Sequence, residues 1–142
     1  MNRIDRRCRA ALACCGFLLV CAAAAAAEFK LYPGASTDAW SNEAQKAARS
    51  ALPPGTESDV YVTNDAYEKV YAFYKAGARE VMLSPGPALP NGTQIKWSFF
   101  ILDRADTMAK SKLWLKVQRP TVADMEMKNV KDVTSIQVVR KK

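Results

Sequence analysis

The chain has 142 residues, four cysteines, no histidine and a formal net charge of +7. All four cysteines lie within residues 8–21, so the rest of the chain contains neither cysteine nor histidine. This composition excludes Ser-His-Asp triads, thiol nucleophiles and thiolate zinc sites from residues 28–142. It also shows no Gly-rich phosphate loop, because the glycines are scattered among predicted turns.

Residues 1–27 predict a secretory signal peptide. Four arginines within residues 3–9 precede an apolar or small run over residues 10–27, and Ala25–Ala27 provide small residues for cleavage. Two alternatives remain open. The 18-residue run is just long enough to serve as an uncleaved membrane anchor, and Cys21 is a candidate for lipidation, although Val20 fits poorly before it. We expect membrane contact only if this segment is kept.

Cleavage after Ala27 would leave residues 28–142 as a single exported domain. The cleaved segment removes four arginines and one aspartate, so the net charge falls from +7 to +4. A charge of this size, spread along the chain, is weak support for nucleic-acid binding, and we expect no nucleic-acid partner. A domain of this length can bury a core without disulfides.

A first helix is predicted over about residues 40–52, after a turn at Tyr32–Ala35. Its predicted buried face is mostly alanine, so we expect close packing and little buried apolar area. Pro53–Gly55 end it firmly. Three residues before it are candidate caps, namely Ser36, Thr37 and Asp38.

A strand at Val60–Thr63 and a second helix at Asp65–Ala76 are predicted next. Thr63 or Asn64 is expected to cap this helix. Its apolar residues fall on one face, with Phe73 at the centre beside Val70. We therefore expect Phe73 to face a sheet.

The remaining chain predicts mainly strands. The segment at residues 95–102 becomes apolar on both faces near its end, as in a central strand. Residues 103–111 form a polar link, and residues 121–131 form a loop or a short helix. The further predicted strands are Glu80–Leu83, Leu113–Gln118 and Val133–Val139.

This order predicts an α+β domain with a mainly antiparallel sheet of four or five strands and two helices on one face. A parallel, doubly wound sheet is disfavoured, because the later strands are not separated by strong helices.

Several short motifs occur along residues 32–134. They are Tyr32-Pro33-Gly34-Ala35, Tyr61-Val62-Thr63-Asn64-Asp65, Val70 with Phe73-Tyr74, Trp114, Gln118-Arg119-Pro120 and Asp132-Val133-Thr134. Together they resemble the motifs of a scattered group of small exported bacterial proteins of unknown function. The resemblance implies a bacterial cell-envelope setting, hence a periplasmic or secreted location, and it carries over no activity and no site residue.

Three tyrosines on the second helix form the main candidate binding surface. Tyr67, Tyr71 and Tyr74 are spaced at i, i+4 and i+7 on one flank. Such a stripe is typical of a ligand groove or partner surface, or of the rim of a core. Trp97 and Trp114, if on neighbouring strands, join the same surface or fill the core. The main prediction is a non-enzymatic exported domain that binds a small ligand or an envelope protein, without a cofactor.

A carboxylate-based hydrolase is one alternative function. Asp103 and Asp106 follow the most apolar strand and could face a cleft at its end. Acidic residues at such positions are more often caps and turn formers. An enzyme that pairs serine with lysine is a related possibility.

A Cu(I)-binding accessory protein is the second alternative. Met125 and Met127 offer soft thioether ligands beside Asp124. Met82 or Met108 would supply a third sulfur. Methionine in cores and edges is the ordinary interpretation.

Overall fold

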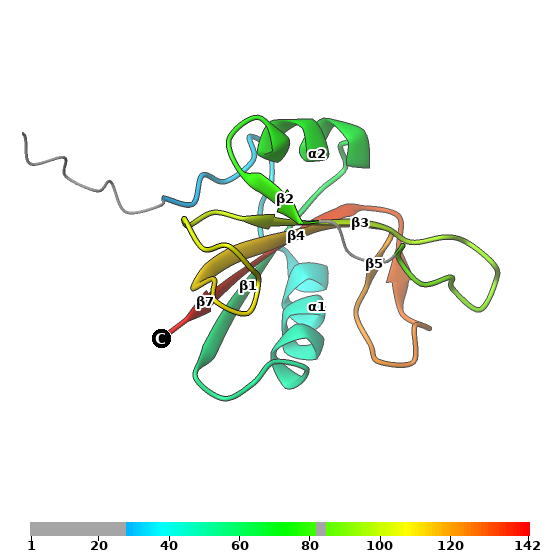
Figure 1. The fold of residues 1–142 in the computed structure, drawn as a ribbon. Helices are drawn as coiled ribbons and strands as arrows, with labels where there is room; N and C mark the ends of the chain where they lie inside the picture. The colour runs from blue at the N-terminus through cyan, green and yellow to red at the C-terminus, as the bar shows by residue number, and fades with distance from the viewer. Residues whose placement is uncertain (1–27, 82–84) are drawn as a thin grey trace, which may run out of the picture.

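The computed structural model describes residues 28–81 and 85–142, in which two helices accompany one large and one small sheet (Figure 1). The predicted signal peptide and Met82 lie outside these residues. The helices are α1 (Ala39–Ser50) and α2 (Tyr67–Lys75). The strands are β1 (Thr56–Thr63), β2 (Arg79–Val81), β3 (Lys96–Ile101), β4 (Leu113–Arg119), β5 (Thr121–Val122), β6 (Val130–Lys131) and β7 (Thr134–Lys141).

The large sheet has five strands in the order β1-β7-β4-β3-β2, and every neighbouring pair is antiparallel. The last strand, β7, lies between β1 and β4, with Ile136 opposite Tyr61 on one side and Val117 on the other. The predicted α+β class with a mainly antiparallel sheet is thereby confirmed.

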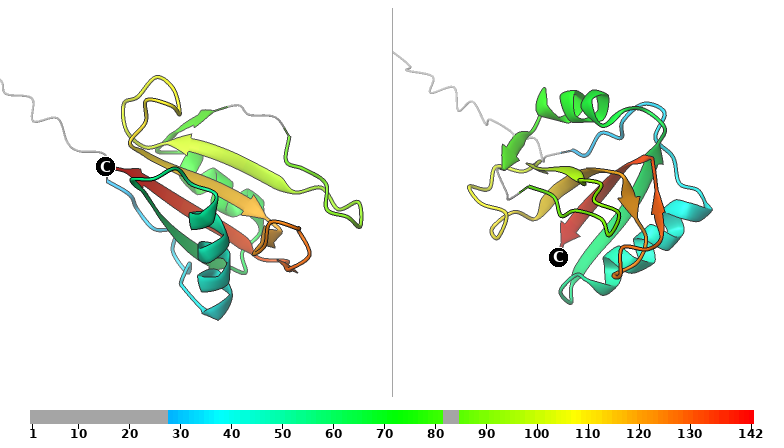
Figure 2. Two further views of the ribbon diagram at one scale, coloured as in Figure 1. Left: turned by 90° about the horizontal axis from the view of Figure 1, so that it is seen from below. Right: turned by 90° about the vertical axis from the view of Figure 1, so that its right-hand side faces the viewer.

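The two helices cover opposite faces of this sheet (Figures 1 and 2). On one face, Val70 and Tyr74 of α2 belong to a core cluster with Leu115 of β4. On the other face, Ala44 of α1 lines a cavity together with Lys116, the next residue of β4. Neighbouring residues of a strand point to opposite faces. The prediction that both helices share one face is therefore wrong.

The physical reason for this arrangement lies in the central strands. Residues 134–139 of β7 are all buried, so both faces of this strand need a cover. Two helices on one face would leave Val60 and Val139 exposed to water on the other. Both side chains are buried in the observed fold, and burying apolar area drives folding.

Helix α1 begins at the predicted position. Asp38 is its N-cap, and its carboxylate accepts a hydrogen bond of 2.7 Å from the backbone N–H of Ser41. The Ser41 hydroxyl in turn accepts from the Asp38 backbone N–H at 2.7 Å, which completes a capping box. Gly55, with φ of +79°, then reverses the chain into β1.

Helix α2 begins two residues later than predicted and lacks a side-chain cap; its N-cap is Ala66. The preceding backbone is instead held by the sheet, since the Asp65 carbonyl accepts from Thr134 Oγ1 at 2.7 Å and from Arg119 Nη1 at 2.9 Å. These contacts are distant in sequence, so local capping rules did not reveal them.

The buried aromatic ring of α2 belongs to Tyr74, not to Phe73. Val70 and Tyr74 are 0% and 4% exposed, and burial raises the pKa of Tyr74 to about 12. Phe73 is half-buried and packs edge-on against Tyr32, with ring centroids 5.3 Å apart. Phe73 is therefore not the buried centre of the helix face, as expected, but packs at the edge of the core cluster, where the N-terminal segment also covers the helix.

Residues 121–131, predicted as a loop or a short helix, form the β5–β6 hairpin. The link at residues 103–111 contains turns and bends. Neither helix in the described ranges is long and apolar enough to cross a membrane.

Candidate functional site

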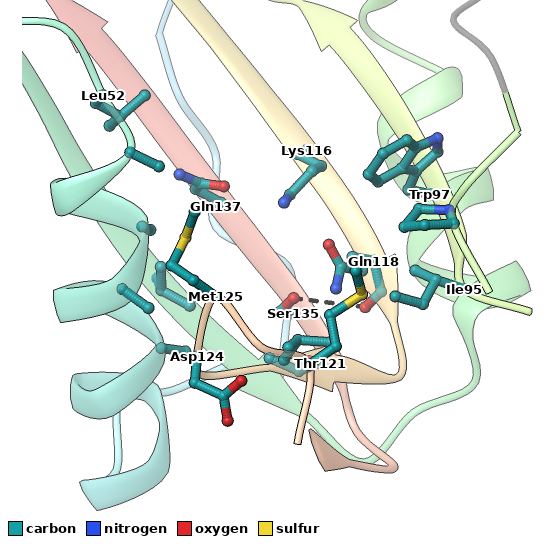
Figure 3. A pocket seen from close by; sticks show the side chains of 18 of the residues that line it. Leu52, Ile95, Trp97, Lys116, Gln118, Thr121, Asp124, Met125, Ser135 and Gln137 are labelled. Carbon is teal, nitrogen blue, oxygen red and sulfur yellow. Dashed lines mark hydrogen bonds between the residues drawn. The ribbon is translucent and has the colours of Figure 1, made fainter. Parts of the chain in front are cut away.

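A cavity of about 350 Å³ lies on the α1 face of the sheet, and we call it the α1 groove (Figure 3). Helix α1 forms one side, and the other side comes from β3 and the segment before it. The β5–β6 hairpin closes one end, and strands β4 and β7 form the floor. The residues that line it include Ala44, Ala47, Ala48, Ala51, Leu52, Val60, Pro87, Ile95, Trp97, Phe99, Trp114, Lys116, Gln118, Thr121, Asp124, Met125, Met127, Ser135 and Gln137.

The alanine face of α1 creates the space for this groove. The helix packs on β1 at one edge of the sheet and presents only methyl groups toward β4. Larger side chains at these positions would fill the volume that is now open. The alanines of α1 contribute little buried apolar area. Because they are small, they also leave the neighbouring sheet surface accessible.

Aromatic rings form the opposite wall. Trp97 and Phe99 of β3 have ring centroids 5.5 Å apart, and Phe99 and Trp114 have centroids 6.1 Å apart. Ile95 extends this apolar surface. An apolar ligand between the two walls would be removed from water on both sides.

The floor of the groove is polar. Lys116 pairs with Gln137 across β4 and β7, and Gln118 pairs with Ser135 one step further along. The two glutamines and the serine are almost fully buried, at 8% exposed or less. Four polar side chains therefore converge at the centre of a sheet, where apolar residues normally lie.

Both floor glutamines are oriented by hydrogen bonds through their amide nitrogens. Gln118 Nε2 donates to the carbonyl of Pro120 at 3.1 Å, and Gln137 Nε2 donates to Ser58 Oγ at 3.2 Å. An amide NH₂ carries two N–H groups, so each glutamine keeps one for another acceptor.

The Lys116 side chain points into the groove (Figure 3). Its Nζ atom lies 6.0 Å from the centroid of the Trp97 ring. Burial lowers the pKa of Lys116 from 10.5 to about 8. Across residues 28–81 and 85–142, no carboxylate forms an ion pair with this amine.

The β5–β6 hairpin carries two methionines to the mouth of the groove. Its turn is organised by Asp124, whose carboxylate accepts the backbone N–H groups of Lys128, at 3.0 Å, and Asn129. These hydrogen bonds lower the pKa of Asp124. Met125 is 74% exposed, and Met127 adopts a left-handed conformation with φ of 55°. Asp124 is therefore occupied in shaping the hairpin.

The candidate residues from the sequence divide between the two faces of the sheet. Trp97, Trp114, Met125 and Met127 line the α1 groove. The tyrosines of α2 lie on the opposite face. The five aromatic candidates therefore do not form one continuous surface.

The tyrosine hydroxyls of α2 are satisfied within the protein. Tyr67 Oη lies 2.7 Å from Ser98 Oγ, and Tyr71 Oη donates to Glu80 at 2.8 Å. Tyr67 and Tyr71 stack on each other with centroids 5.9 Å apart. Together with buried Tyr74, they contribute mainly to packing between α2 and the sheet.

Asp103 stabilises the link between β3 and β4. Its carboxylate accepts hydrogen bonds from the backbone of Lys112 and Leu113, at 2.6 and 3.2 Å, and from the Ser111 hydroxyl at 3.0 Å. Burial alone would raise the pKa of Asp103, but these donors outweigh it and lower the pKa. Asp106 is exposed and does not line the α1 groove.

Two of the thioether ligands of the metal alternative lie in one groove. The described ranges contain no group of three histidine, cysteine, aspartate or glutamate side chains that could hold an ion, a finding that does not concern thioether ligands. Met125 and Met127 both line the groove, whereas Met108 lies in the link between β3 and β4.

Comparison of the chain with protein-family models, with curated proteins and with solved structures gives no match. The function is therefore argued from the site itself.

Sequence reasoning missed the polar floor of the groove. Lys116 and Gln118 alternate with Leu115 and Val117, a pattern that is equally typical of a strand with one face in water. The available signal was the recurrence of polar residues at alternate positions of two predicted strands, which became β4 and β7.

Proposed function

We propose that this protein is an exported binding domain whose ligand is a small, mainly apolar molecule held in the α1 groove. The observation that carries this proposal is the combination of apolar walls with a polar floor. Ligand sites are typically concave, lined mostly by apolar and aromatic side chains, and provided with a few polar groups that orient the ligand. The volume of about 350 Å³ falls within the usual range of such sites.

The site favours a small molecule over a protein partner. A stable protein interface buries roughly 800 Å² on each partner and usually presents several large apolar or aromatic anchors. Within residues 28–81 and 85–142, Met125 is the single large apolar side chain that is strongly exposed. The aromatic rings lie instead inside the groove, where only a ligand of limited size would reach them.

Export is supported by the pattern of residues 1–27, in which a basic start precedes an apolar run and a small-residue end. The absence of cysteine and histidine from the remaining chain also favours binding over catalysis, because most nucleophile and metal chemistry is excluded.

A neutral fluorescent dye tests the proposed site. N-phenyl-1-naphthylamine is uncharged and brightens when it leaves water, so we expect it to bind the purified protein with saturable fluorescence. Ala48→Leu would place a larger side chain in the groove, and we expect it to weaken dye binding at least tenfold.

Ala72→Leu is the matched control, because Ala72 is an exposed alanine of α2 on the other side of the sheet. Both changes keep a good helix former in a helix. Circular dichroism would verify that both variants fold. Equal dye affinity of the Ala48→Leu variant and the wild type, or no saturable binding at all, would exclude the groove as the site.

A further inference from the structure

The α1 groove contains two charged side chains that do not pair with each other. Two charged residues line it in the described part of the chain, Lys116 at the floor and Asp124 at the hairpin. Asp124 is occupied by backbone N–H groups of the hairpin turn. Lys116 points into the cavity without an ion-pair partner (Figure 3).

Lys116 is half-buried in this groove, where its ammonium gives up part of its hydration without gaining an opposite charge. Most exposed lysines of this protein do have a carboxylate partner, for example Lys75 with Glu80 at 2.9 Å and Lys96 with Glu68 at 2.6 Å. Lys116, inside the groove, has no such partner among the described residues. A ligand that brings an anion into the groove would supply that partner.

Two polar side chains of the floor lie beside Lys116 (Figure 3). Gln137 lies opposite Lys116 on β7, and Gln118 lies two residues along on the same face of β4. The amide nitrogens of both glutamines are bonded to Ser58 and Pro120, so Lys116 is the group on the floor that would hold an anion. A single lysine neutralises one negative charge, which favours a monoanion such as a carboxylate over a phosphate dianion.

We infer that the α1 groove binds monocarboxylates with an apolar body, the carboxylate pairing with Lys116 and the body lying between α1 and the aromatic wall. This inference rests on the proposed function and specifies the class of its ligand. The Lys116 Nζ atom would donate charge-assisted hydrogen bonds to the carboxylate, and these are stronger than bonds between neutral groups.

Displacement of N-phenyl-1-naphthylamine by two matched compounds tests the inference. The compounds are 1-naphthylacetate, which is anionic at pH 7, and 1-naphthaleneacetamide, its neutral counterpart of nearly the same shape. We expect the wild type to bind the carboxylate at least tenfold more tightly than the amide. In the Lys116→Met variant this preference should disappear, while the dye and the amide still bind.

Lys112→Met is the control for a general loss of positive charge, because Lys112 is exposed and does not line the groove. It should retain the preference for the carboxylate. Lys116→Gln offers a second neutral variant if Lys116→Met folds poorly, and Lys116→Arg, which keeps the charge, should restore part of the preference.

The possible failures are distinguishable. Binding of the dye and of both compounds with equal affinity would overturn the carboxylate inference and leave the proposed apolar site intact. A preference that persists in Lys116→Met would also overturn it, because the anion would then be held elsewhere. Failure of the dye and both compounds to bind would overturn the proposed function itself.

Discussion

Lys116 keeps its charge at neutral pH in surroundings that disfavour it. Its pKa of about 8 lies below the ordinary lysine value of 10.5, because burial penalises the charged form. Between these two pH values the unfolded chain binds more protons at this residue than the folded chain. The contribution of Lys116 to folding stability therefore rises with pH through this window and is least favourable below pH 8.

We predict that Lys116→Met raises the thermal stability of the ligand-free protein at pH 7. Methionine fills a similar volume without a charge, so the cost of burying the ammonium is removed. The gain over the wild type should shrink by pH 10, where Lys116 has largely lost its proton in the folded state. Differential scanning fluorimetry of both proteins at the two pH values would measure this.

Other lysines with shifted pKa values, such as Lys75, are present in both proteins, so their effects cancel in the comparison. A Lys116→Met variant less stable than the wild type at pH 7 would show that the amine has a stabilising partner. Residues of a functional site often lower the stability of the ligand-free protein and strengthen ligand binding. Lys116 is expected to do both.

At the scale of elements, the two helices have different tasks. Helix α2 closes the core through Val70 and Tyr74, both buried against the sheet. Helix α1 is anchored by its capping box and covers one edge of the other face, but its alanines leave that face partly open. One helix therefore mainly stabilises the fold, and the other shapes the site.

We predict that Val70→Ala destabilises the protein by roughly 1.5–3 kcal/mol, because a fully buried valine contributes about this much. Lys69→Ala, one position earlier on the exposed side of α2, should change stability little, since its ion pair with Asp65 is a surface pair with a separation of 3.5 Å. Chemical denaturation of the two variants compares them directly. Similar stabilities would mean that α2 is rotated about its axis relative to the observed packing.

At the scale of the whole molecule, residues 1–27 have the pattern of a segment that is cleaved off during export. If the proposed export holds, we expect the N-terminus of the protein recovered from its native cells to lie at or within a few residues of Glu28, because small residues suited to cleavage come just before it. Intact-mass measurement of protein recovered from a producing bacterium would identify the first residue. A mass that matches all 142 residues, or one with a lipid on Cys21, would contradict cleavage at this point.

The sequence was sufficient to predict the class of the fold. Turn residues such as Pro53–Gly55 and alternating strands such as residues 113–118 act through local backbone preferences, so they are visible without a structure. The composition also excluded histidine and cysteine chemistry from residues 28–142. Whether Trp97 and Trp114 lie on neighbouring strands was left open by the sequence, and the pairing of β3 with β4 places them so.

The tertiary structure decided how the sheet is covered and what lies on each side of it. Whether Lys116 and Gln118 face water or a cavity depends on where α1 packs, and that packing joins residues far apart in the chain. The same dependence separates the tyrosines of α2 from the tryptophans, because a strand alternates its side chains but does not specify which helix covers each face. The local sequence pattern thus determined where the helices and strands lie. The need to bury both faces of β7 decided that the helices cover opposite faces, which forms a groove with Lys116 at its floor.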